Sequence, residues 1–255
     1  ALADYGESRL IPLLLPLMRD QSADVRNQAA FILASKGTNH GLLAVKKVLF
    51  DRNEVEPVKE AAISGLGRSR DPGSIPILME KLGEDSELQD PLLEALMKKG
   101  DKKEVAAVME LYPVLPLGAR KRFSALAADL NPVWEGNLLA LLSEEHSSLR
   151  DPILSFLEGG KYTEKQISRL RHRDPKERKR AASTLAFLAT QESYRGIILA
   201  ARDSAAEVRA EAIGAVEALS PADRNRILTG LSEDPDRRVR KHTRWLMDRI
   251  ASKEK

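Results

Sequence analysis

The chain has 255 residues, of which 42% are hydrophobic and 31% charged, a balance typical of a folded globular protein. It contains no cysteine, which excludes disulfides, thiolate metal sites and cysteine nucleophiles. No apolar run reaches the roughly 18 residues that a membrane-spanning helix needs. Aromatic residues contribute only 4%, whereas Leu and Ala dominate the apolar set, which favours helices over strands. We therefore expect an all-α protein that does not insert into membranes and lies in a reducing cytoplasm.

The net charge of +3 is distributed unevenly along the chain. Residues 161–255 contain 22 Lys and Arg against 14 Asp and Glu, a net charge of +8. Residues 1–160 carry 19 basic against 24 acidic residues, a net charge of −5. This asymmetry predicts that an acidic partner would meet the C-terminal part of the chain.

The predicted helices come in pairs, and the pair recurs about every 30 residues. The first helix of each pair is an apolar segment whose hydrophobic residues lie three and four positions apart, which predicts one buried face. Polar turns rich in Asp and Ser follow, and these residue types cap the next helix. In chain order, the apolar segments are 8–18, 41–50, 74–82, 103–112, 137–142, 165–170, 194–201 and 222–231.

The second helix of each pair opens with an aliphatic residue, then a basic one, then small residues. A bulky apolar residue follows eight positions after the first. The pattern is strongest in DVRNQAAFILASKG (24–37), PVKEAAISGLGRSRD (57–71), EVRAEAIGAVEAL (207–219) and RVRKHTRWLMDRI (238–250). Weaker copies lie at 87–101, 118–130, 149–160 and 177–188, the copy at 118–130 being the poorest. The residues at position eight are Leu33, Leu66, Leu96, Leu126, Leu157, Leu185, Val216 and Met247. The chain is thus predicted to fold as eight helical hairpins.

An Asp-rich turn followed by Val-Arg, Ala-Ala and Leu resembles the HEAT-like repeat, in the short form also found in phycobilin lyases. The resemblance covers nearly the whole chain. It implies a right-handed α-α superhelix, or solenoid, with first helices on the convex side and second helices on the concave side. In such arrays each hairpin buries its apolar face only against its neighbours, and the concave surface binds partners.

The resemblance also implies a structural role for the recurring basic residue that follows the aliphatic one. In this family such residues form ion pairs between repeats with acidic residues of the turns. The basic residues at this position are Arg26, Lys59, Arg150, Arg178, Arg209 and Arg240. The candidate turn acids are Asp20, Asp51, Asp174, Asp203 and Asp234.

Several further basic residues of the C-terminal part are not explained by the repeat. They are our candidates for partner binding: Arg171, Arg173, Lys179, Arg180, Arg237, Arg238, Lys241 and Arg244. One interpretation is a solvated helix surface with local acidic partners. The other is a positive stripe that binds an acidic protein segment or nucleic-acid phosphates, the latter in a salt-dependent manner. Aromatic residues spaced to stack on bases are missing from the stripe, which disfavours nucleic acid.

The sequence predicts no catalysis, and no catalytic, cofactor or metal site. HEAT-like di-iron hydroxylases use His-Glu dyads, but none of the four histidines is followed by Glu, and no HExxH motif or phosphate-binding Gly loop is present. HEAT-like DNA glycosylases hold a nucleotide with Trp, Tyr and Asp together. The two tryptophans here, Trp134 and Trp245, lie about four repeats apart. We expect Trp245 to serve in packing or terminal capping.

The opening residues ALADYG (1–6) resemble the end of a second helix, with Leu2 near position eight. We therefore expect residues 1–255 to form one solenoid that is a piece of a longer protein. The predicted function is a non-catalytic, monomeric scaffold that binds a protein partner through the second helices. An acidic segment or another domain of the same chain would be the partner. The alternative is a nucleic-acid-binding solenoid, glycosylase-like, that uses the basic C-terminal repeats.

Overall fold

In the computed structural model, residues 7–84, 87–143 and 148–253 are described. Their regular structure is entirely helical, with sixteen α-helices and three short 3-10 helices and no strand in these ranges. The all-α prediction is confirmed. The chain divides into two compact units, residues 1–160 and 161–255, so the single array over 1–255 stays a prediction. The expected partial repeat in residues 1–6 lies outside the described residues.

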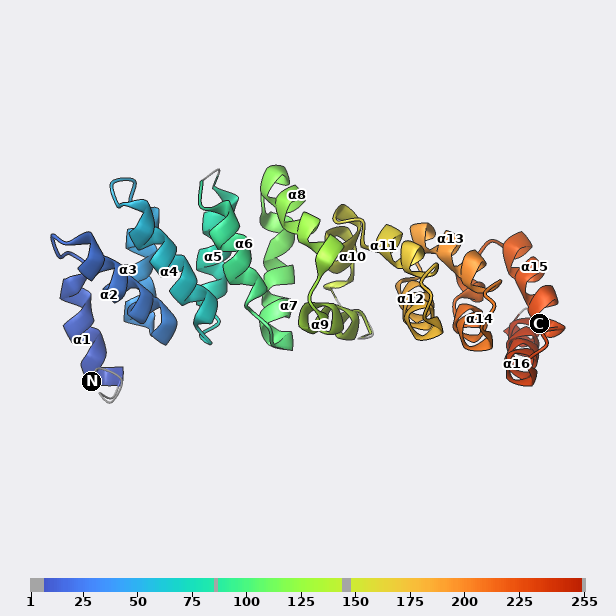
Figure 1. Cartoon of the computed structure of the whole chain (residues 1–255). Helices are drawn as coiled ribbons and strands as arrows, with labels where there is room; N and C mark the ends of the chain where they lie inside the picture. The colour runs from blue at the N-terminus through green and yellow to red at the C-terminus, as the bar shows by residue number, and fades with distance from the viewer. Residues whose placement is uncertain (1–6, 85–86, 144–147, 254–255) are drawn as a thin grey trace. The chain divides into compact units, whose positions relative to one another are not determined.

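The first unit contains five hairpins, each made of a first and a second helix. First helices pack on neighbouring first helices, and α2, α4 and α6 likewise pack in succession (Figure 1). The first helices are α1 (Glu7–Leu17), α3 (Asn39–Phe50), α5 (Ser74–Gly83), α7 (Lys102–Leu111) and α9 (Pro132–Leu142). The second helices are α2 (Ala23–Lys36), α4 (Glu56–Arg68), α6 (Gln89–Met97), α8 (Leu117–Ala125) and α10 (Arg150–Gly159). The 3-10 helices η1 (Tyr112–Val114) and η2 (Leu126–Asp129) belong to the fourth hairpin.

The second unit contains three hairpins built in the same way. The second helices α12, α14 and α16 follow one another in one row, and α11, α13 and α15 lie in the other (Figure 1). The first helices are α11 (Tyr162–Arg169), α13 (Gln191–Ala200) and α15 (Pro221–Ser232). The second helices are α12 (Pro175–Leu188), α14 (Ala206–Ile213) and α16 (Arg237–Lys253), and η3 (Val216–Ala218) ends the seventh hairpin. No helix in the described ranges is long and apolar enough to cross a membrane.

The residue at position eight of the repeat fills the core in six of the eight hairpins. The fourth hairpin departs from the pattern, because α8 ends at Ala125 and the chain tightens into η2. There Phe123 and Ala127 are buried, while Leu126 is only partly buried. In the last hairpin the residue at position eight, Met247, is 39% exposed, and the adjacent Leu246 is buried in the core instead.

An aromatic cluster forms the core where the fourth and fifth hairpins meet. The Phe123 and Phe156 rings lie edge to face with centroids 5.1 Å apart, and Tyr112 and Trp134 pack against both. The Trp134 indole N–H donates to the carbonyl of Met97 at 3.1 Å. Such edge-to-face packing adds about 0.5–1.5 kcal/mol per pair to the burial energy. Phe123 stands where the first and sixth repeats have the second residue of an Ala pair.

A buried lysine connects three helices of the first unit. Lys99 Nζ donates to the carbonyl of Ser69 and to Ser74 Oγ, the latter at 2.9 Å, and lies 3.7 Å from Glu104 Oε1. Burial lowers the pKa of Lys99, although Glu104 acts in the opposite direction. All three donors of this ammonium are therefore directed at protein oxygens, and Lys99 has a structural role.

Candidate binding surface

Arg178 joins two successive hairpins of the second unit. Its Nε and Nη2 donate to the two carboxylate oxygens of Asp203 at 2.8 and 2.9 Å. Its Nη1 donates to the carbonyls of His172 and Arg173 in the turn before α12. One guanidinium thus binds the turn of its own hairpin and the turn of the next. This is the bidentate geometry for which Arg is better suited than Lys.

Arg209 repeats this arrangement one hairpin further along. It forms two hydrogen bonds of 2.6 and 2.7 Å to Asp234, and Nη1 donates to the carbonyls of Asp203 and Ser204. In the first unit, Arg26 makes the same bidentate contact with Glu54, at 2.9 and 2.8 Å. The turn acid in that hairpin is therefore Glu54 and not Asp51.

The other basic residues of this set behave differently. Among the described residues, Arg240 donates to the carbonyls of Asp234 and Pro235 in its own turn and to no acidic side chain. Lys59 makes no ion pair or side-chain hydrogen bond within the described residues, and Arg150 begins α10. Asp20, Asp51 and Asp174 instead accept hydrogen bonds from backbone N–H groups two residues ahead.

These ion pairs hold carboxylates in the charged form. The hydrogen bonds from Arg26 and Arg209 lower the pKa of Glu54 and of Asp234, against the effect of burial. For Asp203, burial acts to raise the pKa, but the hydrogen bonds from Arg178 and from a backbone N–H outweigh it, so the pKa is lowered. All three acids have lower pKa values in the folded chain than in the unfolded one.

We expect the free energy of unfolding to decrease as the pH is lowered below about 5, because the unfolded chain binds protons more readily at these three acids than the folded chain does. The stabilisation by the three charged carboxylates is complete above their pKa of about 4 in the unfolded chain. It is lost as the pH falls through their lower pKa values in the folded chain. Urea titrations at pH 6 and pH 3 measure the difference. A double variant, Arg178→Met with Arg209→Met, should show a smaller difference between these two pH values. An equal difference in wild type and variant would contradict this assignment.

The second helices of the second unit carry the candidate binding surface. We call it the second-helix surface and define it by ten residues at matching positions on three helices, all of them exposed or half-buried. They are Lys176, Lys179 and Arg180 of α12, Glu207, Ala210 and Glu211 of α14, and Arg238, Lys241, His242 and Trp245 of α16. A shallow cavity of about 140 Å³ lined by Lys179, Glu207 and Arg238 among others joins the three helices into one surface.

Charge on the second-helix surface alternates by helix. The rows on α12 and α16 are basic, and the row on α14 between them is acidic through Glu207 and Glu211. Lys179 Nζ lies 3.5 Å from Glu211 Oε1, so the first two rows contact each other. The third row contains Arg238, which donates to Asp236 and thereby lowers the pKa of Asp236 to about 2. The acidic row on α14 interrupts the positive stripe that was one of the two interpretations of these basic residues.

The eight predicted partner-binding residues are distributed over three locations. Arg171 and Arg173 lie in the turn at 170–174, at the edge of the surface. Lys179, Arg180, Arg238 and Lys241 lie on the second-helix surface, and the first three lie next to an acid: Glu211, Glu177 and Asp236 respectively. Arg237 and Arg244 lie four residues before and three after Lys241 and share with it an exposed face of α16.

The two tryptophans have opposite environments. Trp134 is fully buried, which removes it as a platform for a base. Trp245 is 54% exposed, so it does not pack in the core, and the other expected role, terminal capping, stays a prediction. The Arg249 guanidinium lies over the Trp245 ring at 4.8 Å, and the His242 ring is 5.9 Å away. No group of three or more His, Asp or Glu residues in the described ranges is arranged to hold a metal ion.

The acidic row was missed by the sequence analysis, although a signal for it exists. Glu207 and Glu211 lie one residue before and three residues after Val208, the aliphatic residue at the first position of the repeat pattern. At those same two positions α12 has Lys176 and Arg180. Comparing charges position by position, rather than adding them over residues 161–255, reveals the alternation.

Comparison with known proteins supports the repeat assignment. The family described as HEAT repeats matches residues 11–97. A stretch of 104 residues is 33% identical to Protein YibA of Escherichia coli (strain K12), and the match covers 40% of this chain. YibA of Escherichia coli O157:H7 gives the same values. The chain spans 36% of the length of these curated relatives.

Among solved structures, similar ones are helical repeat proteins. A designed armadillo repeat protein in complex with the peptide (KR)4 has a TM-score of 0.39 at 16% identity, covering 93% of this chain and 98% of that one. Human deoxyhypusine hydroxylase in complex with glycerol has a TM-score of 0.36 at 17% identity, covering 94% and 95%. The complex of CpcE and CpcF of phycocyanin lyase from Nostoc sp. PCC7120 has a TM-score of 0.33 at 16% identity, covering 89% and 95%.

Proposed function

We propose that this chain is a non-catalytic scaffold that binds an extended protein segment across the second-helix surface. The match of residues 11–97 to the HEAT repeat family supports this proposal. The segment belongs to a partner protein or to another domain of the same chain. Stacked helical hairpins commonly bind partners on such a surface. Arg178 and Arg209 are already bound by Asp203 and Asp234, whereas the charged side chains of the second-helix surface are exposed or half-buried and can contact a partner.

The alternation of charge on the three helices is the observation that carries the proposal. A complementary segment would place an acid opposite α12, a base opposite Glu207 and Glu211 of α14, and an acid opposite α16. Packed helices lie about 8–10 Å apart. A peptide in the polyproline II conformation rises about 3.1 Å per residue with three residues per turn, so every third side chain points to the same face. Three peptide residues therefore span one row. The surface fits the motif Glu-x-x-Lys-x-x-Glu.

A fluorescence-anisotropy titration tests this motif. The labelled probe carries Glu-x-x-Lys-x-x-Glu with Gly or Ser at x, and its isomer has the two Glu adjacent and the Lys at the far end. We expect the first peptide to bind at least about tenfold more tightly at low salt, because complementary charges set register and specificity. Raising the salt concentration should reduce this preference. Equal affinity of the two isomers, or no binding of either, would refute the proposal.

Nucleic acid is the second candidate, and the exposed Trp245 beside Arg249 and His242 is the observation that favours it. An exposed aromatic ring among basic residues is the kind of platform on which unpaired bases stack. The acidic row opposes it, because a phosphate backbone crossing from α12 to α16 would pass over Glu207 and Glu211. The buried Trp134 removes support for a glycosylase-like site.

Titration with single-stranded and duplex DNA across salt concentrations separates the two candidates. Micromolar affinity that weakens steeply with salt would favour nucleic acid and overturn the protein-binding proposal. Weak or absent binding at physiological salt is the result we expect. The variant Trp245→Ala serves as a control, because it should matter for single-stranded DNA only if bases stack on the ring.

A further inference from the structure

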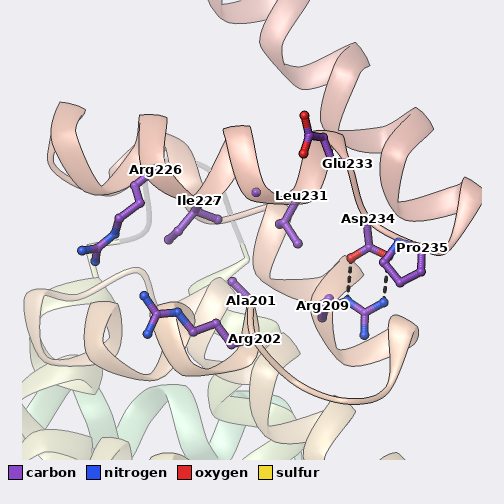
Figure 2. A pocket seen from close by; sticks show the side chains of 10 residues that line it. Ala201, Arg202, Arg209, Arg226, Ile227, Leu231, Glu233, Asp234 and Pro235 are labelled. Carbon is purple, nitrogen blue, oxygen red and sulfur yellow. Dashed lines mark hydrogen bonds and ion pairs between the residues drawn. The ribbon is translucent and has the colours of Figure 1, made fainter.

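A cavity of about 400 Å³ lies between the end of α13 and α15, among the last hairpins of the second unit. Its apolar wall is formed by Ala201, which follows α13, and by Ile227 and Leu231 of α15 (Figure 2). None of its lining residues belongs to the second-helix surface. The volume is within the range of about 300–1,000 Å³ typical of binding pockets.

Charge in this cavity is separated between its two ends. Figure 2 shows the guanidinium groups of Arg202 and Arg226 at one end, and Glu233 and Asp234 at the other. At the second end, Arg209 neutralises Asp234 through their two hydrogen bonds. The arginine end carries two positive charges, contributed by two different hairpins.

The two arginines at that end are only weakly satisfied by the protein itself. The Arg202 side chain is exposed and has no hydrogen bond or ion pair within the described ranges. Arg226 Nη2 lies 3.1 Å from Asp223 Oδ1, but the two side chains are 61% and 39% exposed, so water screens this pair. Two guanidinium groups facing one opening repel each other, and an anion placed between them would relieve the repulsion. Planar carboxylates match the donors of guanidinium groups in geometry.

We propose that this cavity binds an acidic residue flanked by aliphatic residues in a segment of a partner protein. The carboxylate would accept hydrogen bonds from Arg202 and Arg226, and the neighbouring aliphatic side chain would lie on Ile227 and Leu231. The combination of a cationic end with an apolar wall selects this occupant over a bare anion, since a bare anion makes no use of the wall. The cavity is separate from the second-helix surface. Experiments can therefore refute binding in the cavity without refuting the proposed function, and the reverse also holds.

The test is an NMR titration of the full chain that follows the arginine Nε–H signals, assigned with the single variants Arg202→Gln and Arg226→Gln. The probe is a Gly/Ser peptide with a central Leu-Glu-Leu. We expect the signals of Arg202 and Arg226 to shift in a saturable manner. Peptides with Leu-Gln-Leu or Ser-Glu-Ser at the centre should bind at least about fivefold more weakly. The first lacks the carboxylate for the two arginines, and the second lacks the aliphatic side chains for the apolar wall.

Gly230 offers a variant that closes the cavity without disturbing the fold. It lines the cavity from within α15, and a Cβ added there would meet no atom within 4 Å. Leucine also favours the helix more than glycine does. Gly230→Leu should therefore remain folded, by circular dichroism, and lose at least about tenfold in peptide affinity. Gly118→Leu is the matched control, because Gly118 lies in a helix with the same open space and lines no part of this cavity.

Three results would overturn the proposal. One is unchanged binding by Gly230→Leu, and another is equal binding of the Glu and Gln peptides. The third is a response to free glutamate or inorganic phosphate as strong as the response to the peptide, which would indicate a site for small anions. The double variant Arg202→Gln with Arg226→Gln should lose binding of the Leu-Glu-Leu peptide, measured by the anisotropy of a labelled peptide, and keep its binding of the Glu-x-x-Lys-x-x-Glu probe.

Discussion

Replacing Trp134 with alanine is expected to lower the free energy of unfolding by about 3–5 kcal/mol, the largest effect of any substitution considered. Its side chain is fully buried and packs against Phe123 and Phe156. The variant would lose the transfer energy of the indole and leave a cavity among rigid rings that relax little. It would also leave the carbonyl of Met97 without the indole donor.

Trp245→Ala is the matched control for this substitution. Trp245 is 54% exposed and contacts only groups of its own helix in the ring interactions described above. Its replacement should change the free energy of unfolding by less than about 1 kcal/mol. Urea titrations monitored by circular dichroism measure both variants. If the two variants were equally stable, the aromatic cluster would not be the core of the fourth and fifth hairpins.

The second large effect is expected at Arg209. The substitution Arg209→Met keeps the aliphatic stem but removes both hydrogen bonds to Asp234, whose side chain is only 3% exposed. A buried carboxylate without its partner is costly, and two turn carbonyls lose their donor as well. We expect the free energy of unfolding to fall by about 3 kcal/mol.

Arg180→Met provides the comparison. Arg180 pairs with Glu177 three residues earlier, but its side chain is 79% exposed. Exposed pairs of this kind contribute little, so the loss should be below about 0.5 kcal/mol. Urea unfolding at pH 7 measures both substitutions. A similarly small effect of Arg209→Met would show that the inter-repeat pair contributes no more than a surface pair.

The repeat unit could be predicted from the sequence because the hairpin is a local structure with a regular period. The strict offset of eight breaks in α16, where Met247 at position eight is exposed and the adjacent Leu246 is buried. The buried residues there are Val239, Thr243 and Leu246. Because Thr243 is polar, these buried positions do not form a continuous apolar pattern in the sequence. In the fourth hairpin α8 ends at Ala125 and η2 changes the register, so Phe123 and Ala127 are buried and Leu126 is only partly buried.

The candidate site was harder to predict than the fold. The sequence pattern marked Arg178 and Arg209 and their acids, because the repeat places them at constant offsets. It could not mark Glu54 as the partner of Arg26, since two acids of that turn compete and only geometry chooses between them. The pocket at Arg202 and Arg226 joins residues of different hairpins whose side chains meet only in the folded chain. No spacing in the sequence indicates such a meeting.

The central claim is that alternating charge on the second-helix surface selects the partner. The most direct test compares the preference for one peptide over its isomer before and after the charge of the acidic row is reversed. Anisotropy titrations would measure the affinities of the Glu-x-x-Lys-x-x-Glu peptide and its isomer for wild type and for Glu207→Lys with Glu211→Lys. Both side chains are at the surface, so the variant should fold. We predict a preference of at least about tenfold in wild type that falls to about one in the variant, with a gain in DNA affinity. An unchanged preference in the variant would contradict the account.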